Sequence, residues 1–151
     1  IGDILKNVDL LSINIDEAAA LVKDKDIVES CCRKMDRLHK GAELIVTDGG
    51  NGSYAYSGGK LQKFDVIESA VVSTAGAGDS FLGGVMVGKC LGLPLVKDVE
   101  DAFFGQTPLV TSTELGILAS HFAVESADTI PKNFSAEEIL RMHGRCAGIF
   151  G

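Results

Sequence analysis

The sequence lacks long hydrophobic runs, an excess of basic residues and cysteine pairs of the metal-binding type. No stretch approaches the ~18 uninterrupted apolar residues that a membrane-spanning helix needs, and no signal peptide is expected. Lys and Arg number 14 against 21 Asp and Glu, so the net charge is −7. This acidic balance argues against a nucleic-acid-binding surface and against a basic patch for membranes.

The cysteines give no sign of a metal site. Cys31 and Cys32 are adjacent, Cys90 and Cys146 stand alone, no CxxC occurs, and no histidine has zinc-like spacing from them. We therefore expect reduced thiols, as in a cytosolic protein or one of an organelle stroma. The chain begins at Ile1, not Met, directly in front of patterned sequence, which favours a fragment of a longer protein.

The composition of the 151 residues, 46% hydrophobic and 23% charged, fits one globular domain with a sizeable core. Apolar periodicity predicts helices and strands in alternation, which favours a parallel sheet. Buried strands are expected over Asp9–Ile13 and Glu43–Thr47, and a hairpin with a Gly-Gly turn over Ser53–Phe64. Helices are expected over Ile1–Val8, as the end of a longer one, from Asn14 to Val22, over Ile27–His39 with Gly41 as the C′ residue, over Lys97–Phe104, over Thr113–Val124 and from Ser135 to about Cys146.

The stretch Val72–Phe81 is the most informative one. Gly76, Ala77 and Gly78 leave their backbone N–H groups uncovered just where a helix begins, which makes a seat for a phosphate. Asp79 would repel an anion, so its presence favours a base that removes a proton from a hydroxyl attacking a phosphoryl group. The alternative is a carboxylate that only stabilises the helix dipole.

The helix that follows, from Gly78 to about Leu91, is almost wholly apolar or small, so we expect it to be buried on most sides. Gly83, Gly84 and Gly88 within it suggest close packing against neighbours, because each is unfavourable in a helix. Known glycine fingerprints do not fit. A Walker A loop would need Lys at Gly84, a Rossmann loop would need Gly at Phe81, and no GxSxG is present.

Two other turns follow strands. Asn14 and Glu17 come after the first strand, and a glycine-rich turn from Asp48 to Gly52 comes after the second. Carboxyl ends of strands in a doubly wound sheet converge on one crevice, so the three features together suit a nucleoside triphosphate with magnesium. Taken singly, Asn14 and Glu17 also fit a capping box, and the glycines also fit a simple turn.

The same residues carry a family resemblance. Ser73–Phe81 resembles the signature D-T-x-G-A-G-D-x-F of ribokinase-like, or PfkB, carbohydrate kinases, Asn14–Glu17 their N-x-x-E motif, and Thr47–Gly52 their T-x-G-x-x-G loop. The motifs occur in family order, and the resemblance extends from about Val8 to Asn133. It implies a three-layer α/β/α fold, with residues 1–151 as the C-terminal, nucleotide-binding part and with the N-terminal half and the lid absent.

The resemblance also implies roles. Asp79 would be the general base, and Gly76, Ala77 and Gly78 the anion hole for the γ-phosphoryl group. Glu17 and Asn14 would hold Mg²⁺, mostly through water, with Asn14 also close to the nucleotide. ATP would be lined by Thr47, Asp48, Gly49, Gly50, Asn51 and Gly52. The acceptor would be a small molecule with a hydroxyl group, namely a sugar, polyol or nucleoside, and a homodimer is a candidate assembly.

Two departures keep a second hypothesis open. Ser73 replaces the leading Asp of the signature, which in the family helps to bind a monovalent cation, so that cation is in doubt here. The half of the family fold that supplies the sugar-binding residues is also missing. The alternative is a kinase-like domain without activity that serves as a structural or binding subunit.

Overall fold

The computed structural model describes residues 2–97, 111–127 and 135–145. The chain divides into two compact units, Ile1–Phe64 and Asp65–Gly151. The helix predicted over Lys97–Phe104 lies, apart from its first residue, outside the described residues. No helix within the described part of the chain combines the length and apolar character needed to cross a membrane.

The first unit contains a four-stranded sheet in the order β1-β2-β3-β4. β1 (Leu10–Asn14) and β2 (Glu43–Thr47) run parallel, whereas β3 (Ser53–Ser57) and β4 (Lys60–Phe64) continue the sheet antiparallel. The predicted hairpin is confirmed. Its two turn residues, Gly58 and Gly59, have φ of 59° and 84°, which the tight hairpin turn requires and which glycine adopts most readily.

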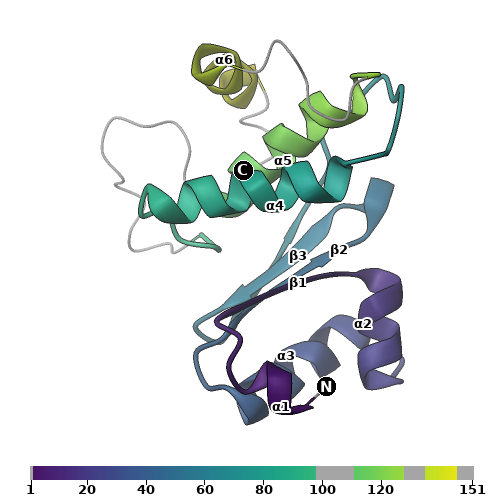
Figure 1. Ribbon diagram of the computed structural model, residues 1–151, viewed down its shortest axis with the longest axis vertical. Coiled ribbons are helices and arrows are strands. Elements are labelled where there is room, and N and C mark those ends of the chain that lie inside the picture. The colour runs from purple at the N-terminus through teal and green to yellow at the C-terminus, as the bar shows by residue number, and fades with distance from the viewer. Residues whose placement is uncertain (1, 98–110, 128–134, 146–151) are drawn as a thin grey trace. The chain divides into compact units, whose positions relative to one another are not determined.

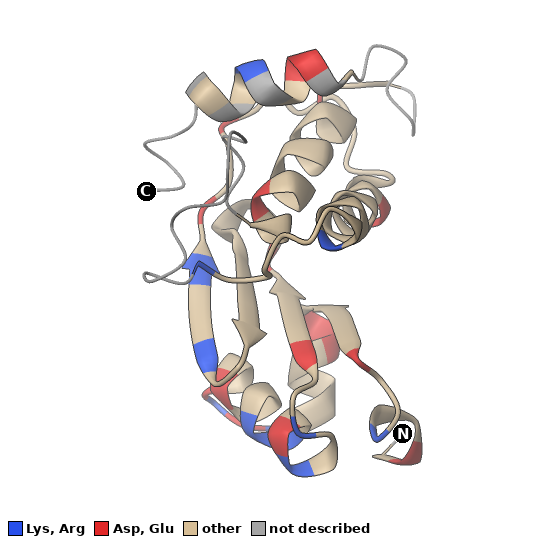
Figure 2. Ribbon diagram, turned by 90° about the vertical axis from the view of Figure 1, so that its left-hand side faces the viewer, with Lys and Arg blue, Asp and Glu red and all other residues tan. Residues whose placement is uncertain are grey.

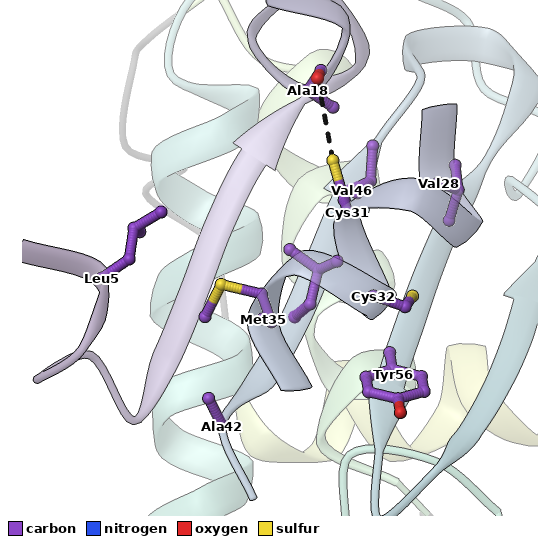
Figure 3. Close-up of a cluster of buried hydrophobic side chains, with 10 residues drawn as sticks. Leu5, Ala18, Val28, Cys31, Cys32, Met35, Ala42, Val46 and Tyr56 are labelled. Carbon is purple, nitrogen blue, oxygen red and sulfur yellow. Dashed lines mark hydrogen bonds between the residues drawn. The ribbon is translucent and has the colours of Figure 1, made fainter. Parts of the chain in front are cut away.

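Helices α1 (Gly2–Leu5), α2 (Ile15–Val22) and α3 (Ile27–Leu38) gather on one face of this sheet (Figure 1). Alternate residues of β2, Leu44 and Val46, point toward them because side chains of a strand alternate between faces. They pack against Cys31 and Met35 of α3, both fully buried, and the Cys31 thiol lies 3.7 Å from the Ala18 carbonyl oxygen (Figure 3). This core fixes where β1 and β2 end.

Some predictions for the first unit were inaccurate. The first strand begins one residue later than expected and is half-buried, because β1 is the edge strand of the sheet. The first helix is only four residues long. Gly41 has a φ of 91° as expected for a turn, but α3 already ends at Leu38 with an extended His39 as C-cap, so Gly41 is not the C′ residue.

The second unit contains α4 (Ala77–Cys90), α5 (Ser112–Val124) and α6 (Ala136–Arg145). α4 and α5 pack closely through glycine. A Cβ atom at Gly84 would lie 2.6 Å from the Leu115 carbonyl oxygen, and one at Gly88 would lie 2.6 Å from Cα of Ser112. The close packing predicted for these two glycines is therefore confirmed. The cap predicted for α6 is present as well, with the Glu138 N–H donating to the Ser135 hydroxyl at 3.2 Å.

α4 is not buried on most sides, contrary to the prediction. Among the described residues its buried positions form one stripe: Phe81, Gly84, Val85 and Gly88. Leu82, Met86, Val87 and Leu91 are exposed, and a Cβ at Gly83 would contact nothing within 4 Å. Figure 2 shows how few charged residues α4 carries compared with α3. Apolar composition alone does not reveal how many faces of a helix have partners.

Candidate active site

The N-terminus of α4 has no side-chain cap. Gly76 precedes the helix with φ 78° and ψ 0°, a left-handed conformation that favours glycine. The first bond of the helix runs from the Ser80 N–H to the Gly76 carbonyl oxygen at 2.9 Å, and the Ala77 N–H donates to the Thr74 carbonyl at 3.3 Å. The Ala77 N–H, which the sequence placed among the uncovered groups, is therefore used within the turn. In the described residues, the N–H groups of Gly76, Gly78 and Asp79 donate to no backbone carbonyl. They are the donors open to an anion.

Asp79 differs from the acids at the same position of two other helices. Glu17 and Glu114 are the third residues of α2 and α5, and each closes a capping box with its N-cap residue, Asn14 or Thr111. Asp79 is the third residue of α4, but its N-cap is Gly76, which has no side chain to complete such a box. The carboxylate is exposed, and no hydrogen bond or ion pair joins it to another described residue.

The segment before α4 is held by the end of α5. The N–H groups of Val72 and Ser73 both donate to the Val124 carbonyl oxygen, at 2.7 and 3.1 Å. The Ser73 hydroxyl accepts a hydrogen bond from the Ala75 N–H at 3.2 Å. The serine that replaces the acid of the family signature therefore shapes the loop from Thr74 to Gly76, which leads into the uncapped start of α4.

In the first unit, the residues predicted to bind the metal and the nucleotide lie together where β1 and β2 end, at the carboxyl ends of the two strands. β1 and β2 are parallel and their last residues, Asn14 and Thr47, are register partners. The capping box considered from the sequence is present: the Asn14 side-chain oxygen accepts from the Glu17 N–H at 2.8 Å, and Glu17 Oε2 accepts from the Asn14 N–H at 2.9 Å. Both side chains remain exposed to solvent.

The glycine-rich turn after β2 is closed by its own bonds. The 3-10 turn η1 (Gly49–Asn51) is preceded by Asp48, whose N–H donates to the Gly52 carbonyl at 2.8 Å. Asn51 also donates from its side chain to the Asp48 carboxylate at 3.2 Å. Gly52 is buried with φ 104°, whereas Gly49 and Gly50 are exposed. The exposed residues of this turn are therefore Gly49, Gly50 and Asn51.

The predicted site residues thus form two groups, one in each unit. Asn14, Glu17 and the turn from Thr47 to Gly52 lie together at the carboxyl ends of β1 and β2. Gly76 to Asp79 lie together at the start of α4. No cluster of three or more His, Cys, Asp or Glu side chains suited to a metal occurs among the described residues.

Sequence reasoning missed a further group beside the loop. Ser69, His121 and Glu125 lie close together, with the Ser69 hydroxyl 2.5 Å from His121 Nδ1 and His121 Nε2 3.6 Å from a Glu125 oxygen. His121 lies in an apolar helix, which is compatible with a core histidine or with one at the edge of the nucleotide site, and it is buried with polar contacts. Nothing local pointed to Ser69, because it lies 52 positions earlier in the chain.

Comparison with known proteins decides the family. The sequence profile of the pfkB family carbohydrate kinases matches residues 1–133. The chain belongs to the pfkB family. The resemblance inferred from the three motifs, which spanned about Val8 to Asn133, is thereby confirmed.

Among curated relatives, the chain is 27% identical over 140 residues to an ATP-dependent 6-phosphofructokinase from Thermoanaerobacterium thermosaccharolyticum. The match covers 92% of this chain and 41% of that enzyme. The chain therefore spans about two fifths of the length of this relative.

Solved structures show the fold. A chain described as ribokinase II from E. coli, solved with ATP and Mg²⁺, superposes with a TM-score of 0.73 at 19% identity, covering 95% of this chain and 42% of that one. A nucleoside kinase from Burkholderia thailandensis, solved with inosine, gives 0.72 at 17% identity, with 95% and 42% covered. The predicted ribokinase-like α/β fold, present here in part, is confirmed by these superpositions.

Proposed function

We propose that the protein containing this chain transfers the γ-phosphoryl group of ATP to a hydroxyl group of a sugar, polyol or nucleoside. The observation that carries the proposal is the start of α4, where Gly76 leaves the helix uncapped and Asp79 stays exposed. Free N–H groups and the positive end of the helix dipole suit the charge of a transferring phosphoryl group. An unpaired carboxylate at the same helix end suits a general base.

The chemistry follows from these groups. Asp79 accepts the proton of the acceptor hydroxyl as its oxygen attacks the γ-phosphorus in line. A new P–O bond forms, the bond to the bridging oxygen of ADP breaks, and ADP leaves with that electron pair. The N–H groups of Gly78 and Asp79 face the anionic oxygens, with the loop from Gly76 as their support. Gly49 and Gly50 line the nucleotide.

Magnesium fits the residues at the end of β1. The Glu17 carboxylate and the Asn14 amide oxygen are exposed hard ligands, and Glu17 Oε1 accepts no hydrogen bond from the described residues. Mg²⁺ keeps several waters and needs only one or two protein oxygens beside substrate phosphates, so a sparse site is sufficient. The ion would supply neutralisation of phosphate charge. A homodimer and an intracellular location stay predictions.

The test is made on the full-length protein, because this chain spans only part of its relatives. Transfer from ATP is measured as phosphorylated product with a panel of sugars, polyols and nucleosides. Asp79→Asn should lower kcat by about 100-fold or more, the upper range of general base catalysis. Asp26→Asn is the matched control, since Asp26 is also at a helix start without a cap bond and should leave kcat unchanged.

Each outcome is informative. Undiminished transfer by Asp79→Asn would refute the base assignment. Failure of the wild-type protein to phosphorylate any acceptor, with ATP still bound, would favour the alternative of an inactive kinase-like subunit. Ser73, which lacks the charge of the family's acid, is the residue that supports this alternative.

A further inference from the structure

We propose that Ser69, His121 and Glu125 form a clamp that positions the loop from Thr74 to Gly76, which leads into the proposed anion-binding start of α4. His121 is therefore a positioning residue for phosphoryl transfer. This inference rests on the proposed function of that loop. All three residues lie in the second unit, outside the motifs that carry the family resemblance.

The first argument is the set of bonds around the clamp. The Ser69 hydroxyl lies 2.5 Å from His121 Nδ1 and 3.0 Å from the Ile67 carbonyl oxygen. Glu125 makes two contacts: one oxygen lies 3.6 Å from His121 Nε2, and the other accepts from the Ala70 N–H at 3.2 Å. Side chains of α5 and of its C-cap residue Glu125 thus hold two consecutive residues of the incoming segment.

The second argument is continuity with the loop. Directly after Ala70, the N–H groups of Val72 and Ser73 donate to the Val124 carbonyl oxygen at the end of α5. Thr74 then begins the turn that leads into α4, and α4 itself packs on α5 through Gly84 and Gly88. The loop is therefore anchored to α5 on both sides. Val71 and Val72 are exposed, with 61% of their surface accessible, so apolar burial does not hold this segment.

The third argument is that phosphoryl transfer slows when the backbone N–H donors are not held in place. Backbone donors of an anion hole stabilise a transition state only when they are fixed before the reaction, and a displacement of about 1 Å can lower the rate by about 10²-fold. His121 is buried, with 7% of its surface accessible, and its contact with Ser69 is partly shielded from competing water, whereas the Glu125 side chain is exposed. Its removal should loosen the segment from Ser69 to Ser73 without touching ATP or the acceptor.

The experiment uses the full-length protein with Ser69→Ala, His121→Leu and Glu125→Gln. Each should lower kcat, His121→Leu by about 10-fold or more, with KM for ATP and acceptor changed by less than about 3-fold. His121→Asn, which keeps a polar atom toward Ser69, should recover part of the loss. Ile117→Val, on α5 but outside the clamp, is the control for general loss of stability and should leave kcat unchanged.

Hydrogen exchange gives a second measurement that does not depend on activity. The amides of Val72 and Ser73 should exchange faster in His121→Leu, and as in the wild type in Ile117→Val. Unchanged exchange at these amides, or faster exchange with unchanged kcat, would overturn the clamp as a positioning device. A wild-type protein that transfers no phosphate to any acceptor would instead overturn the proposed function, and with it the catalytic meaning of the clamp.

Discussion

Alanine substitutions at two neighbouring glycines of α4 should have effects of opposite sign. At Gly84, a Cβ atom would lie 2.6 Å from the Leu115 carbonyl oxygen, 2.8 Å from Cα of Gly116 and 2.9 Å from the Ala119 side chain. Two of these are backbone atoms, which cannot turn aside as the end of a side chain can. At Gly83, in contrast, a Cβ would meet nothing within 4 Å.

The magnitude follows from two opposing contributions. Replacing glycine by alanine in a helix gains about 1 kcal/mol at either position. Overpacking a close contact costs about 1–3 kcal/mol, toward the upper end where backbone must move. Gly83→Ala should therefore raise the free energy of unfolding by up to about 1 kcal/mol, and Gly84→Ala should lower it by about 2 kcal/mol. The difference between the variants is about 3 kcal/mol.

Urea denaturation followed by far-UV circular dichroism is the suitable assay, because the chain contains no tryptophan to report by fluorescence. Both variants change the same residue type in the same helix, so each controls for helix propensity in the other. Gly88→Ala should behave like Gly84→Ala, since its Cβ would lie 2.6 Å from Cα of Ser112. Equal shifts at Gly83 and Gly84, of either sign, would refute the close packing of α4 on α5.

Two further predictions concern buried polar groups. Glu114 is 1% exposed, accepts from both the N–H and the hydroxyl of Thr111 and lies 3.3 Å from Lys97 Nζ, so Glu114→Ala should lower stability by about 2–3 kcal/mol. The matched variant Glu17→Ala removes an exposed capping box and should lower the free energy of unfolding by only about 0.5–1 kcal/mol. Equal losses for the two variants in urea denaturation would contradict this reasoning. Tyr56 donates to the Asp36 carboxylate at 2.5 Å, and this bond, with burial, raises the pKa of the Tyr56 phenol to about 12. Because the folded-state pKa is raised, the stabilisation is present below pH ~10 and is lost between about 10 and 12. In an ultraviolet titration Asp36→Asn should shift one tyrosinate transition to lower pH, and an unchanged curve would contradict the role of Asp36.

The local signals in the sequence predicted most of the elements correctly. The strand over Glu43–Thr47, the hairpin, the capping box of α2 and the Ser135 cap of α6 depend on short-range rules, and the structure has them where these rules place them. The family followed from three motifs for the same reason, since each motif is a contiguous stretch. The roles assigned to Asp79, Asn14 and Glu17 stay predictions.

What could not be predicted depends on partners distant in the chain. The apolar composition of α4 gave no information on which face would pack, and only the contact with α5 distinguishes Gly84 from Gly83. The contacts of His121 with Ser69 bridge 52 positions and have no sequence pattern of their own. The burial of β1 was overestimated because its position at the sheet edge is a property of the whole sheet.

The backbone at Gly76 also limits how this site could be lost by mutation. The N-cap residues of α2 and α5 have extended backbones, with φ/ψ of −84°/170° and −132°/155°, whereas Gly76 has 78°/0°. Placing Ser or Asp at position 76 would therefore add a side chain in a strained conformation instead of forming a capped helix start. A more stable helix start needs a different path for the whole loop. Single substitutions therefore do not readily convert this uncapped helix start into an ordinary capped one.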